Sequence, residues 1–340
     1  MTVPAAEPSI PEPHEARERL EQALFEIRRV IAGQDAMLER VLVCLLAQGH
    51  LLIEGVPGLA KTLTIKTTAG VLGGTFSRIQ FTPDLVPSDL VGTRVYRPDE
   101  GTFDTELGPV FCNFLLADEI NRAPAKVQSA LLEVMQESHV TIGKETFPVP
   151  PPFLVMATQN PIESEGTYAL PEAQVDRFML KVLVDYPDAA DELVVIDRAL
   201  AGAVDVDQAL SLEELAGLQA TVRRVYVDPA LTRYAQRLAA ATRDLAQAGL
   251  PALGSYVEYG VSPRGPINLA LAARALALLR GRRYVVADDL RDLMKDVFRH
   301  RIVLSYEALA DGVTPDGVLD SVLEAVELPE QDFVRHEAAS

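Results

Sequence analysis

The stretch from residue 51 to residue 62, LLIEGVPGLAKT, combines residue types that together can bind phosphate groups. An apolar run typical of a buried strand comes first, and Gly55 and Gly58 interrupt it. Glycines let the backbone curl so that its N–H groups converge on an anion, and the helix that follows presents its positive N-terminus to the same anion. In such a loop Lys61 would reach the outer phosphates, and Thr62 would place its hydroxyl on Mg²⁺.

The loop departs from the usual phosphate-binding pattern at one position. That pattern has Gly directly before the Lys, whereas this chain has Ala60. A tight strand-to-helix turn with a surface lysine would use the same residue types, so the prediction needs support from residues further along the chain. The predicted nucleotide contacts in the loop are Gly55, Val56, Pro57, Gly58, Leu59, Ala60, Lys61, Thr62 and Leu63.

Two acids follow an apolar strand in FLLADEINRAP, residues 114–124. In phosphate-loop enzymes an acid at the end of a neighbouring strand completes the Mg²⁺ shell, and we assign this role to Asp118. Glu119 would then be the general base that polarises the attacking water. The alternative is a strand that ends in a solvated acidic turn, but the phosphate loop upstream favours the functional interpretation.

A third apolar strand ends in polar residues at LVMATQNP, residues 154–161. Ligands of open α/β sheets bind at the carboxyl ends of strands, so Asn160 could contact the attacking water or the terminal phosphate. Taken alone, Asn160 is equally typical of an Asn-Pro turn.

Two arginines are candidates for stabilising the charge that develops on a phosphate, because the guanidinium is planar and always ionised. Arg177 lies in EAQVDRF before a strand, and Arg264 lies in GVSPRG at the start of a helix. An arginine supplied across a subunit boundary would make hydrolysis depend on assembly. Taken alone, either arginine is more typical of a surface ion-pair partner, and only the other motifs favour the functional interpretation.

Composition limits the class of protein that positions these residues. The 340 residues are 48% hydrophobic and 24% charged, which is typical of a globular protein of about two to three domains. The net charge of −18 disfavours nucleic acid as a partner, since such binding depends on neutralising phosphates. Cys44 and Cys112 lie in apolar runs, so we expect buried thiols and a reducing cytoplasm. No apolar run is long enough to span a bilayer.

Strand and helix patterns alternate up to residue 186, which predicts a parallel sheet with helices on both faces. We expect strands at 51–53, 76–81, 112–117, 153–157 and 178–184, and inserted hairpins at 94–107 and 139–149. Residues 83–92 should form a turn-rich connector. Asp35 should cap the helix that precedes the loop, and Pro124 should open the helix after the acids.

The strand pattern stops after Tyr186-Pro187, where we place the domain boundary. A nucleotide-binding domain is therefore predicted at 15–187 and an all-helical domain at 188–330, after a disordered Pro-rich tail at 1–14. Ser211 and Glu214 form a capping box at the start of one of its helices.

The motifs, taken together, resemble the MoxR family of AAA+ ATPases. The matching stretches are GHLLIEGVPGLAKT, QFTPDLVPSDLVGT, FLLADEINRAPAKVQSALLEVMQE, PFLVMATQNPIESEGTYALPEAQVDRF, GVSPRG and RHRIVLSYEA, in the same order and spacing from about residue 31 to 325. The two hairpins match the inserts of the helix-2-insert members, and the family tolerates Ala at position 60.

The resemblance implies roles for individual residues. Asn160 would be the first sensor, Arg177 the finger that reaches a neighbour's nucleotide, Arg264 the second sensor in a helical lid, and Gln34 a residue near the adenine. Gly265-Pro266 directly after Arg264 is a departure, because an uninterrupted helix is expected there. The implied fold is a P-loop AAA+ core with a smaller all-α lid.

The implied function is Mg²⁺-dependent ATP hydrolysis by a homo-oligomer, typically a hexamer, that remodels protein partners such as von Willebrand factor A (VWA) domain proteins. A nucleic-acid motor with the same inserts is an alternative, which the acidic balance and the absence of a basic-aromatic strip disfavour. A chelatase-type ATPase subunit is another, which co-purification with a porphyrin-binding subunit would favour. A non-hydrolysing scaffold is disfavoured by the presence of both acids.

Overall fold

The computed structural model describes residues 10–56, 58–99, 101–161, 167–202 and 204–329. Its internal contacts divide the chain into two compact units, Met1–Thr221 and Val222–Ser340. Among the described helices, none combines the length and the apolar composition needed to cross a bilayer.

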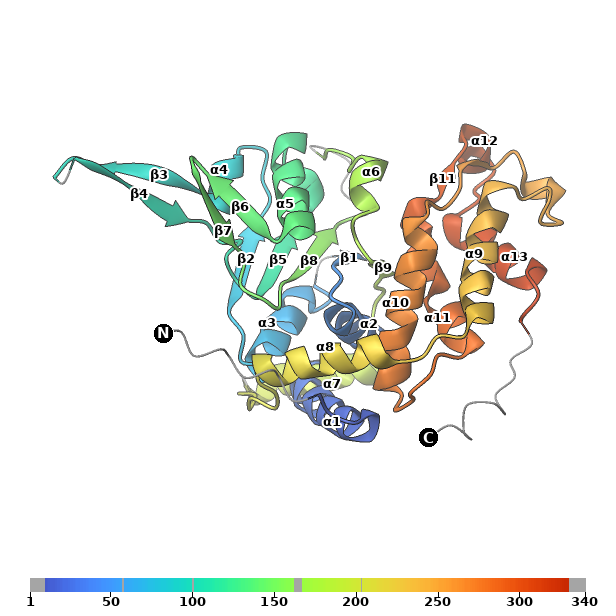
Figure 1. The fold of residues 1–340 in the computed structure, drawn as a ribbon, viewed down its shortest axis with the longest axis horizontal. Helices are drawn as coiled ribbons and strands as arrows, with labels where there is room; N and C mark the ends of the chain where they lie inside the picture. The colour runs from blue at the N-terminus through green and yellow to red at the C-terminus, as the bar shows by residue number, and fades with distance from the viewer. Residues whose placement is uncertain (1–9, 57, 100, 162–166, 203, 330–340) are drawn as a thin grey trace. The chain divides into compact units, whose positions relative to one another are not determined.

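The first unit is built on a five-stranded sheet in which all neighbouring strands are parallel (Figure 1). Its order is β2-β5-β8-β1-β9, with bounds β1 (Leu51–Glu54), β2 (Phe76–Gln80), β5 (Phe114–Asp118), β8 (Leu154–Gln159) and β9 (Leu180–Leu183). The three central strands are buried almost throughout, as expected for a parallel sheet covered on both faces. The predicted parallel sheet is confirmed.

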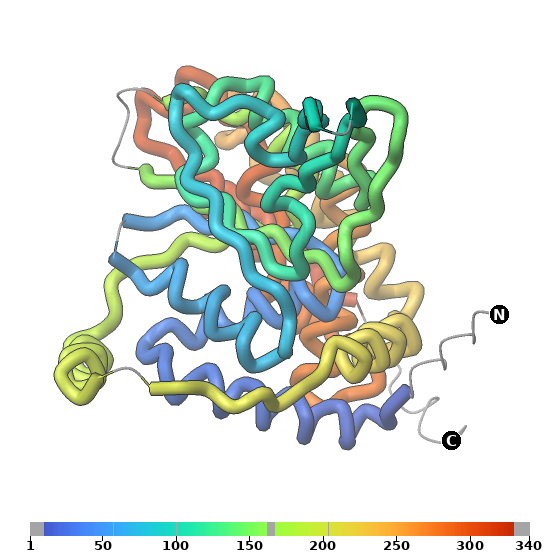
Figure 2. The backbone as a smooth tube through the Cα atoms, turned by 90° about the vertical axis from the view of Figure 1, so that its left-hand side faces the viewer, coloured from blue at the N-terminus to red at the C-terminus, as the bar shows by residue number. Residues whose placement is uncertain are grey.

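Helices cover both faces of this sheet, with α5 on one side and α2 and α3 on the other (Figures 1 and 2). The helices of the unit are α1 (Pro13–Val30), α2 (Asp35–Leu46), α3 (Lys61–Val71), α4 (Pro87–Val91), α5 (Ala125–Glu137), α6 (Glu172–Val175), α7 (Ala189–Ala201) and α8 (Leu212–Arg224), which runs into the second unit. Both predicted hairpins are present, as β3 (Gly92–Arg97) with β4 (Thr102–Leu107) and β6 (His139–Ile142) with β7 (Glu145–Pro148).

The second unit is helical, with a small ribbon of two antiparallel strands. It contains α9 (Pro229–Arg243), α10 (Arg264–Leu279), α11 (Ala287–Phe298), α12 (Tyr306–Ala310), α13 (Pro315–Ala325) and the strands β10 (Val257–Tyr259) and β11 (Val303–Leu304). Buried Asp289 stabilises this unit by pairing with Arg282 at 2.5 Å and by accepting the backbone N–H of Val286 at 3.0 Å. The sequence did not indicate the ribbon, because its strands are only two and three residues long.

Several local predictions differ from the structure. Helix α1 begins at Pro13, inside the predicted tail, of which residues 1–9 lie outside the described residues. Gln34, not Asp35, is the N-cap of α2, and Pro124 is the N-cap of α5 and not its first residue. The connector at 83–92 contains the helix α4. The capping box of Ser211 and Glu214 is confirmed, with hydrogen bonds of 2.8 and 3.1 Å, and both cysteines are buried thiols, as expected.

The proposed domain boundary near 187 coincides with the end of β9, the last strand of the sheet. By its contacts, however, the segment up to Thr221 belongs to the first unit. For example, the capping residue Glu214 pairs with Arg19 of α1 at 2.5 Å, and Gln219 donates to the backbone oxygen of Leu45 at 2.8 Å. The boundary between the functional domains stays a prediction.

His50 connects three elements beneath the sheet. Its Nδ1 accepts the backbone N–H of Val155 at 3.0 Å, so the ring proton lies on Nε2, which donates to the backbone oxygen of Met135 at 3.1 Å. Burial lowers the pKa of His50 from 6.5 to about 4, and the bond to Met135 opposes this shift only in part. Folding therefore favours the neutral ring.

We predict that acid destabilises the first unit through His50. The pKa of His50 is lower in the folded state. The contribution of its neutral ring to the free energy of unfolding is therefore complete above pH 6.5 and is lost as the pH falls towards 4. The pKa difference corresponds to about 3 kcal/mol of unfolding free energy. The free energy of unfolding, measured with urea at a series of pH values, should depend less on pH between 6.5 and 4 in His50→Gln than in the wild type. The exposed His139→Gln is the matched control, and a wild-type slope in His50→Gln would contradict the prediction.

Candidate active site

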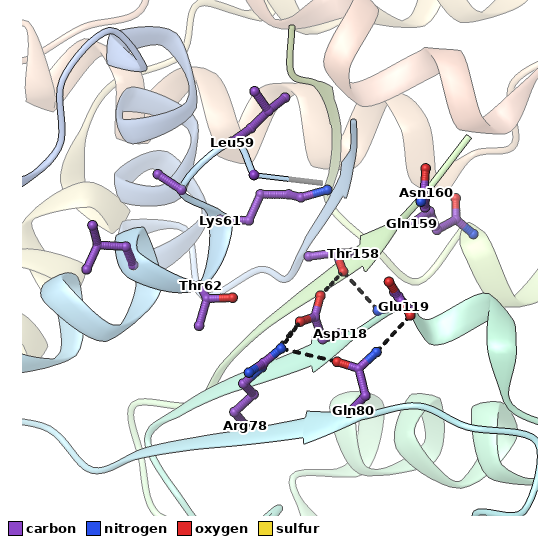
Figure 3. Close-up of a pocket in the computed structure, with 13 residues that line it drawn as sticks. Leu59, Lys61, Thr62, Arg78, Gln80, Asp118, Glu119, Thr158, Gln159 and Asn160 are labelled. Carbon is purple, nitrogen blue, oxygen red and sulfur yellow. Dashed lines mark hydrogen bonds and ion pairs between the residues drawn. The ribbon is translucent and has the colours of Figure 1, made fainter. Parts of the chain in front are cut away.

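A cavity of about 430 Å³ lies where the phosphate loop meets the carboxyl ends of β5 and β8 (Figure 3). The parallel register explains the meeting point, because Glu54 at the end of β1 pairs with Gln159, and Ala117 pairs with Ala157. The loop after β1 and the acids after β5 therefore lie at one edge of the sheet. The described lining residues are Gly58, Leu59, Ala60, Lys61, Thr62, Leu63, Arg78, Gln80, Asp118, Glu119, Thr158, Gln159 and Asn160.

The loop backbone explains the departure at Ala60. Gly58 and Ala60 both have left-handed backbone, with φ of +89° and +55°. Glycine adopts this conformation freely, whereas alanine does so at a cost of about 1–2 kcal/mol. Gly55 is required for a different reason, since an added Cβ would lie 2.5 Å from the backbone oxygen of Val184. The loop conformation is thus the one that the motif needs, and Ala60 tolerates it under strain.

Lys61 is the first residue of α3, so its side chain starts at the positive end of that helix. Its Nζ donates to the backbone oxygen of Gly55 at 2.6 Å, which holds the ammonium against the loop. Burial lowers the pKa of Lys61, and the charges of Asp118 and Glu119 oppose that shift. The ammonium and the N-terminus of α3 together form an anion-binding corner.

Asp118 is held on both carboxylate oxygens. The hydroxyl of Thr158 donates to Oδ1 at 2.6 Å, and the guanidinium of Arg78 pairs with Oδ2 at 2.7 Å. The Thr158 hydroxyl also accepts the backbone N–H of Glu119 at 2.9 Å. Thr158 is itself buried, so this one side chain from β8 sets the positions of both acids on β5.

The residues present fit Mg²⁺. Mg²⁺ prefers oxygen ligands, and it is commonly bound through one or two carboxylates, together with phosphate oxygens and water. The Thr62 hydroxyl and the Asp118 carboxylate line the same cavity and are such ligands. In the part of the chain that the structure describes, no group of three or more His, Cys, Asp or Glu residues could hold a metal ion.

Glu119 projects into the cavity from a strained position. Its φ is +55°, which is uncommon for a residue other than glycine and aims the side chain away from the strand direction. Oε2 accepts from Nε2 of Gln80 at 2.8 Å and pairs with Nε of Arg122 at 2.8 Å. These contacts orient the carboxylate, as a general base requires. Asn160 follows β8, is buried, and lines the cavity with its neighbour Gln159.

The comparisons with known proteins agree with this geometry. Residues 50–180 match the ATPase family associated with various cellular activities (AAA), and residues 252–322 match the AAA lid domain. The chain is 56% identical over 321 residues to Chaperone MoxR1 of Mycobacterium tuberculosis, over 94% of this chain and 85% of that protein. The chain belongs to the MoxR family of AAA+ ATPases.

Another relative and a solved structure match a similar share of the chain. Protein MoxR of Paracoccus denitrificans is 33% identical over 330 residues, which cover 92% of this chain and 96% of that protein. The 2.00 Å crystal structure of a Cytophaga hutchinsonii protein assigned as an ATPase superposes with a TM-score of 0.89. It is 45% identical and covers 94% of this chain and 97% of that one. The predicted AAA+ core with a helical lid is confirmed.

Some residues predicted to contact nucleotide do not line the cavity. Gly55 and Val56 are absent from its described lining, and Pro57 lies outside the described residues. Gln34 lies at the N-cap of α2 and donates to the backbone oxygen of Asp185 at 3.3 Å, so it adjoins the segment after β9. Its place near the adenine stays a prediction.

Arg177 lies apart from this cavity. It follows α6 and is half-buried in the wall of a second cavity of about 470 Å³, whose described lining also contains Ser129, Glu133, Glu137, His139 and Gln174. The structure therefore does not bring Arg177 together with the acids of its own chain. An arginine that serves the site of a neighbouring subunit would be placed in this way.

Arg264 is exposed and begins α10 in the second unit. The helix is uninterrupted, as the family resemblance implies, because α10 runs unbroken from Arg264 to Leu279 through Gly265-Pro266. Pro266 lies in the first helical turn, where a missing backbone N–H costs nothing. Buried Gly265 fits because an added Cβ would lie 2.1 Å from a methyl group of Val261.

Sequence reasoning missed three polar residues that line the cavity and hold its acids. Arg78 and Gln80 lie on β2, which the strand order places directly beside β5. Their alternation along the strand showed that they share one face, but only the order of strands shows that they reach the acids. Thr158 was visible as a polar strand end, and its two hydrogen bonds give it a role in positioning both acids.

Proposed function

We propose that this chain is an Mg²⁺-dependent ATP hydrolase that works as a ring-forming, chaperone-like remodeller of proteins. The observation that carries this proposal is that Lys61, Thr62, Asp118, Glu119 and Asn160 line one cavity at the edge of the sheet. Membership of the AAA+ family supports nucleotide binding and ATPase activity.

Each residue would have a separate task in hydrolysis. Lys61 and the N-terminus of α3 would bind and orient the phosphates, and Thr62 and Asp118 would hold Mg²⁺. The bound metal supplies positive charge that stabilises the transferring phosphoryl group. Glu119 would accept a proton from the attacking water, which Asn160 orients. Gln80 and Arg122 hold the Glu119 carboxylate, so the water meets a base that is already positioned.

Assembly into a homo-oligomer, which we propose to be a hexamer, is supported by the separation of Arg177 from the cavity of its own chain. In a ring, Arg177 would reach the nucleotide of the neighbouring subunit. Arg264, on the lid, would report on the nucleotide from a second direction, on its own or a neighbouring subunit.

We propose protein clients, which the kinship with Chaperone MoxR1 supports, and VWA-domain proteins as partners, which the resemblance to the MoxR family implies. The net charge of −18 supports proteins over nucleic acid as the clients. Co-purification of the chain with a VWA-domain protein is the observation that decides this part of the proposal.

Glu119→Gln should reduce ATP turnover by about 10²–10⁴, because it removes the general base. Nucleotide affinity should stay close to that of the wild type, since glutamine keeps the shape of the side chain and can still accept from Gln80. Steady-state phosphate release and nucleotide binding, measured on the same samples, check both. Glu145→Gln, on the exposed strand β7, is the matched control. Unchanged turnover in Glu119→Gln would contradict the proposed base.

A mixing experiment tests whether Arg177 acts across a subunit boundary. Arg177→Ala and Glu119→Gln should each be inactive alone, and a mixture should regain turnover, because Arg177→Ala subunits keep an intact site and receive Arg177 from their neighbours. Mixing Lys61→Ala with Glu119→Gln is the control, since neither variant has an intact site. Full activity of Arg177→Ala alone, or no recovery at any mixing ratio, would contradict the role of Arg177.

A further inference from the structure

Arg78 pairs with the carboxylate that is proposed to hold the metal. Its Nη2 and Nε donate to Oδ2 of Asp118 at 2.7 and 3.2 Å, so the guanidinium approaches one oxygen with two of its donors (Figure 3). The other oxygen accepts from Thr158. The Arg78 guanidinium therefore already occupies the Asp118 carboxylate, which a divalent cation would need as its protein ligand.

The pair is built into the sheet. Gln80 lies opposite Asp118 in the register of β2 and β5, and Arg78 is two residues earlier, so its side chain runs along the strand to reach the carboxylate. Nη2 of Arg78 also donates to Oε1 of Gln80 at 3.2 Å, and Gln80 in turn donates to Glu119. Strand β2 therefore contacts both acids. The guanidinium of Arg78 contacts Asp118, and the side-chain amide of Gln80 contacts Glu119.

The charges that line the cavity are balanced. Its described lining contains two cations, Lys61 and Arg78, and two anions, Asp118 and Glu119. A divalent cation alone would add positive charge beside Arg78 and compete with it for one carboxylate. A polyphosphate adds negative charge at the same place and gives the guanidinium an alternative partner that suits its planar fork.

We propose that Arg78 is a counter-cation for Asp118 that couples metal binding to nucleotide binding. Metal alone must displace the guanidinium, whereas metal that enters with a polyphosphate finds the guanidinium free to turn to the phosphate oxygens. Arg78 is thus a positioning residue that acts through Asp118. This inference rests on the proposed Mg²⁺-ATP function and adds to it an order of preference, in which the site disfavours Mg²⁺ without nucleotide.

The side chain of Arg78 is exposed enough to move. Asp118 is buried enough that its ion pair with Arg78 should contribute a measurable free energy. Arg78 has 49% of its side chain exposed and Asp118 has 16%. Arg97, on the hairpin strand β3, pairs with Asp104 at 2.9 Å with 51% exposure on both sides, far from any strand end of the central sheet. Arg97→Gln is therefore a matched control for the loss of a half-exposed arginine ion pair.

The experiment compares the wild type, Arg78→Gln and Arg97→Gln in two calorimetric titrations. In the first, MgCl₂ is added without nucleotide, and Arg78→Gln should bind Mg²⁺ about fivefold more tightly, which is the effect of removing one partly exposed ion pair. In the second, ADP is added in EDTA or in MgCl₂. Arg78→Gln should bind metal-free ADP more weakly, and its gain in ADP affinity on adding Mg²⁺ should be smaller than that of the wild type by a similar factor, because only in the wild type does bound ADP relieve the competition between Arg78 and Mg²⁺. Arg97→Gln should match the wild type in both.

The outcomes separate this inference from the proposed function. Equal loss of ADP affinity with and without Mg²⁺ would show that Arg78 is only a phosphate ligand and would overturn the inference, as would unchanged Mg²⁺ affinity in the first titration. Failure of every protein to bind ADP would overturn the Mg²⁺-ATP function, while the first titration would still decide whether Arg78 competes with metal. Arg78→Lys, which keeps the charge and loses the fork, should give intermediate values if Arg78→Gln is unstable.

Discussion

The parallel register of the central strands is the constraint on which the site depends. Strands β1, β5 and β8 are each hydrogen-bonded on both sides and buried on both faces, so none can shift without exposing its apolar residues. Their carboxyl ends therefore stop at one level. The phosphate loop, the two acids and Asn160 come from segments far apart in the chain, and the register alone brings them together. His50 secures the opposite end of the same strands through Val155 and Met135.

The sheet places charged side chains of both signs at that edge, and their balance keeps the two acids together. Two acids in adjacent positions would repel each other and any phosphate, and the structure offsets this with Arg78 and Lys61 as cations and with hydrogen bonds from Thr158 and Gln80. The strained backbone at Ala60 and Glu119 belongs to the same arrangement, because both left-handed residues lie directly where a strand or loop turns into the site.

The local part of this site could be predicted from the sequence, and the non-local part could not. Lys61, Thr62, Asp118 and Glu119 lie in short motifs whose residue types and order imply their chemistry. Arg78 and Thr158 act across strands, and only the strand order, which no local pattern encodes, shows that they hold the acids. The sheet, both hairpins and most helices follow from apolar periodicity. The short helix α4 and the ribbon of β10 and β11 do not, because a helix of five residues is little more than one turn, and strands of two and three residues are too short to show a period.

The central claim is that the edge of this sheet binds a nucleotide through Lys61, and binding is its most direct test. Calorimetric titration of the wild-type protein with a non-hydrolysable ATP analogue in Mg²⁺ should give one bound nucleotide per chain. Lys61→Ala should bind at least about 100-fold more weakly, since it removes a charge-assisted contact from a partly buried anion site. Absence of binding to the wild type, or equal affinity in Lys61→Ala, would contradict the account.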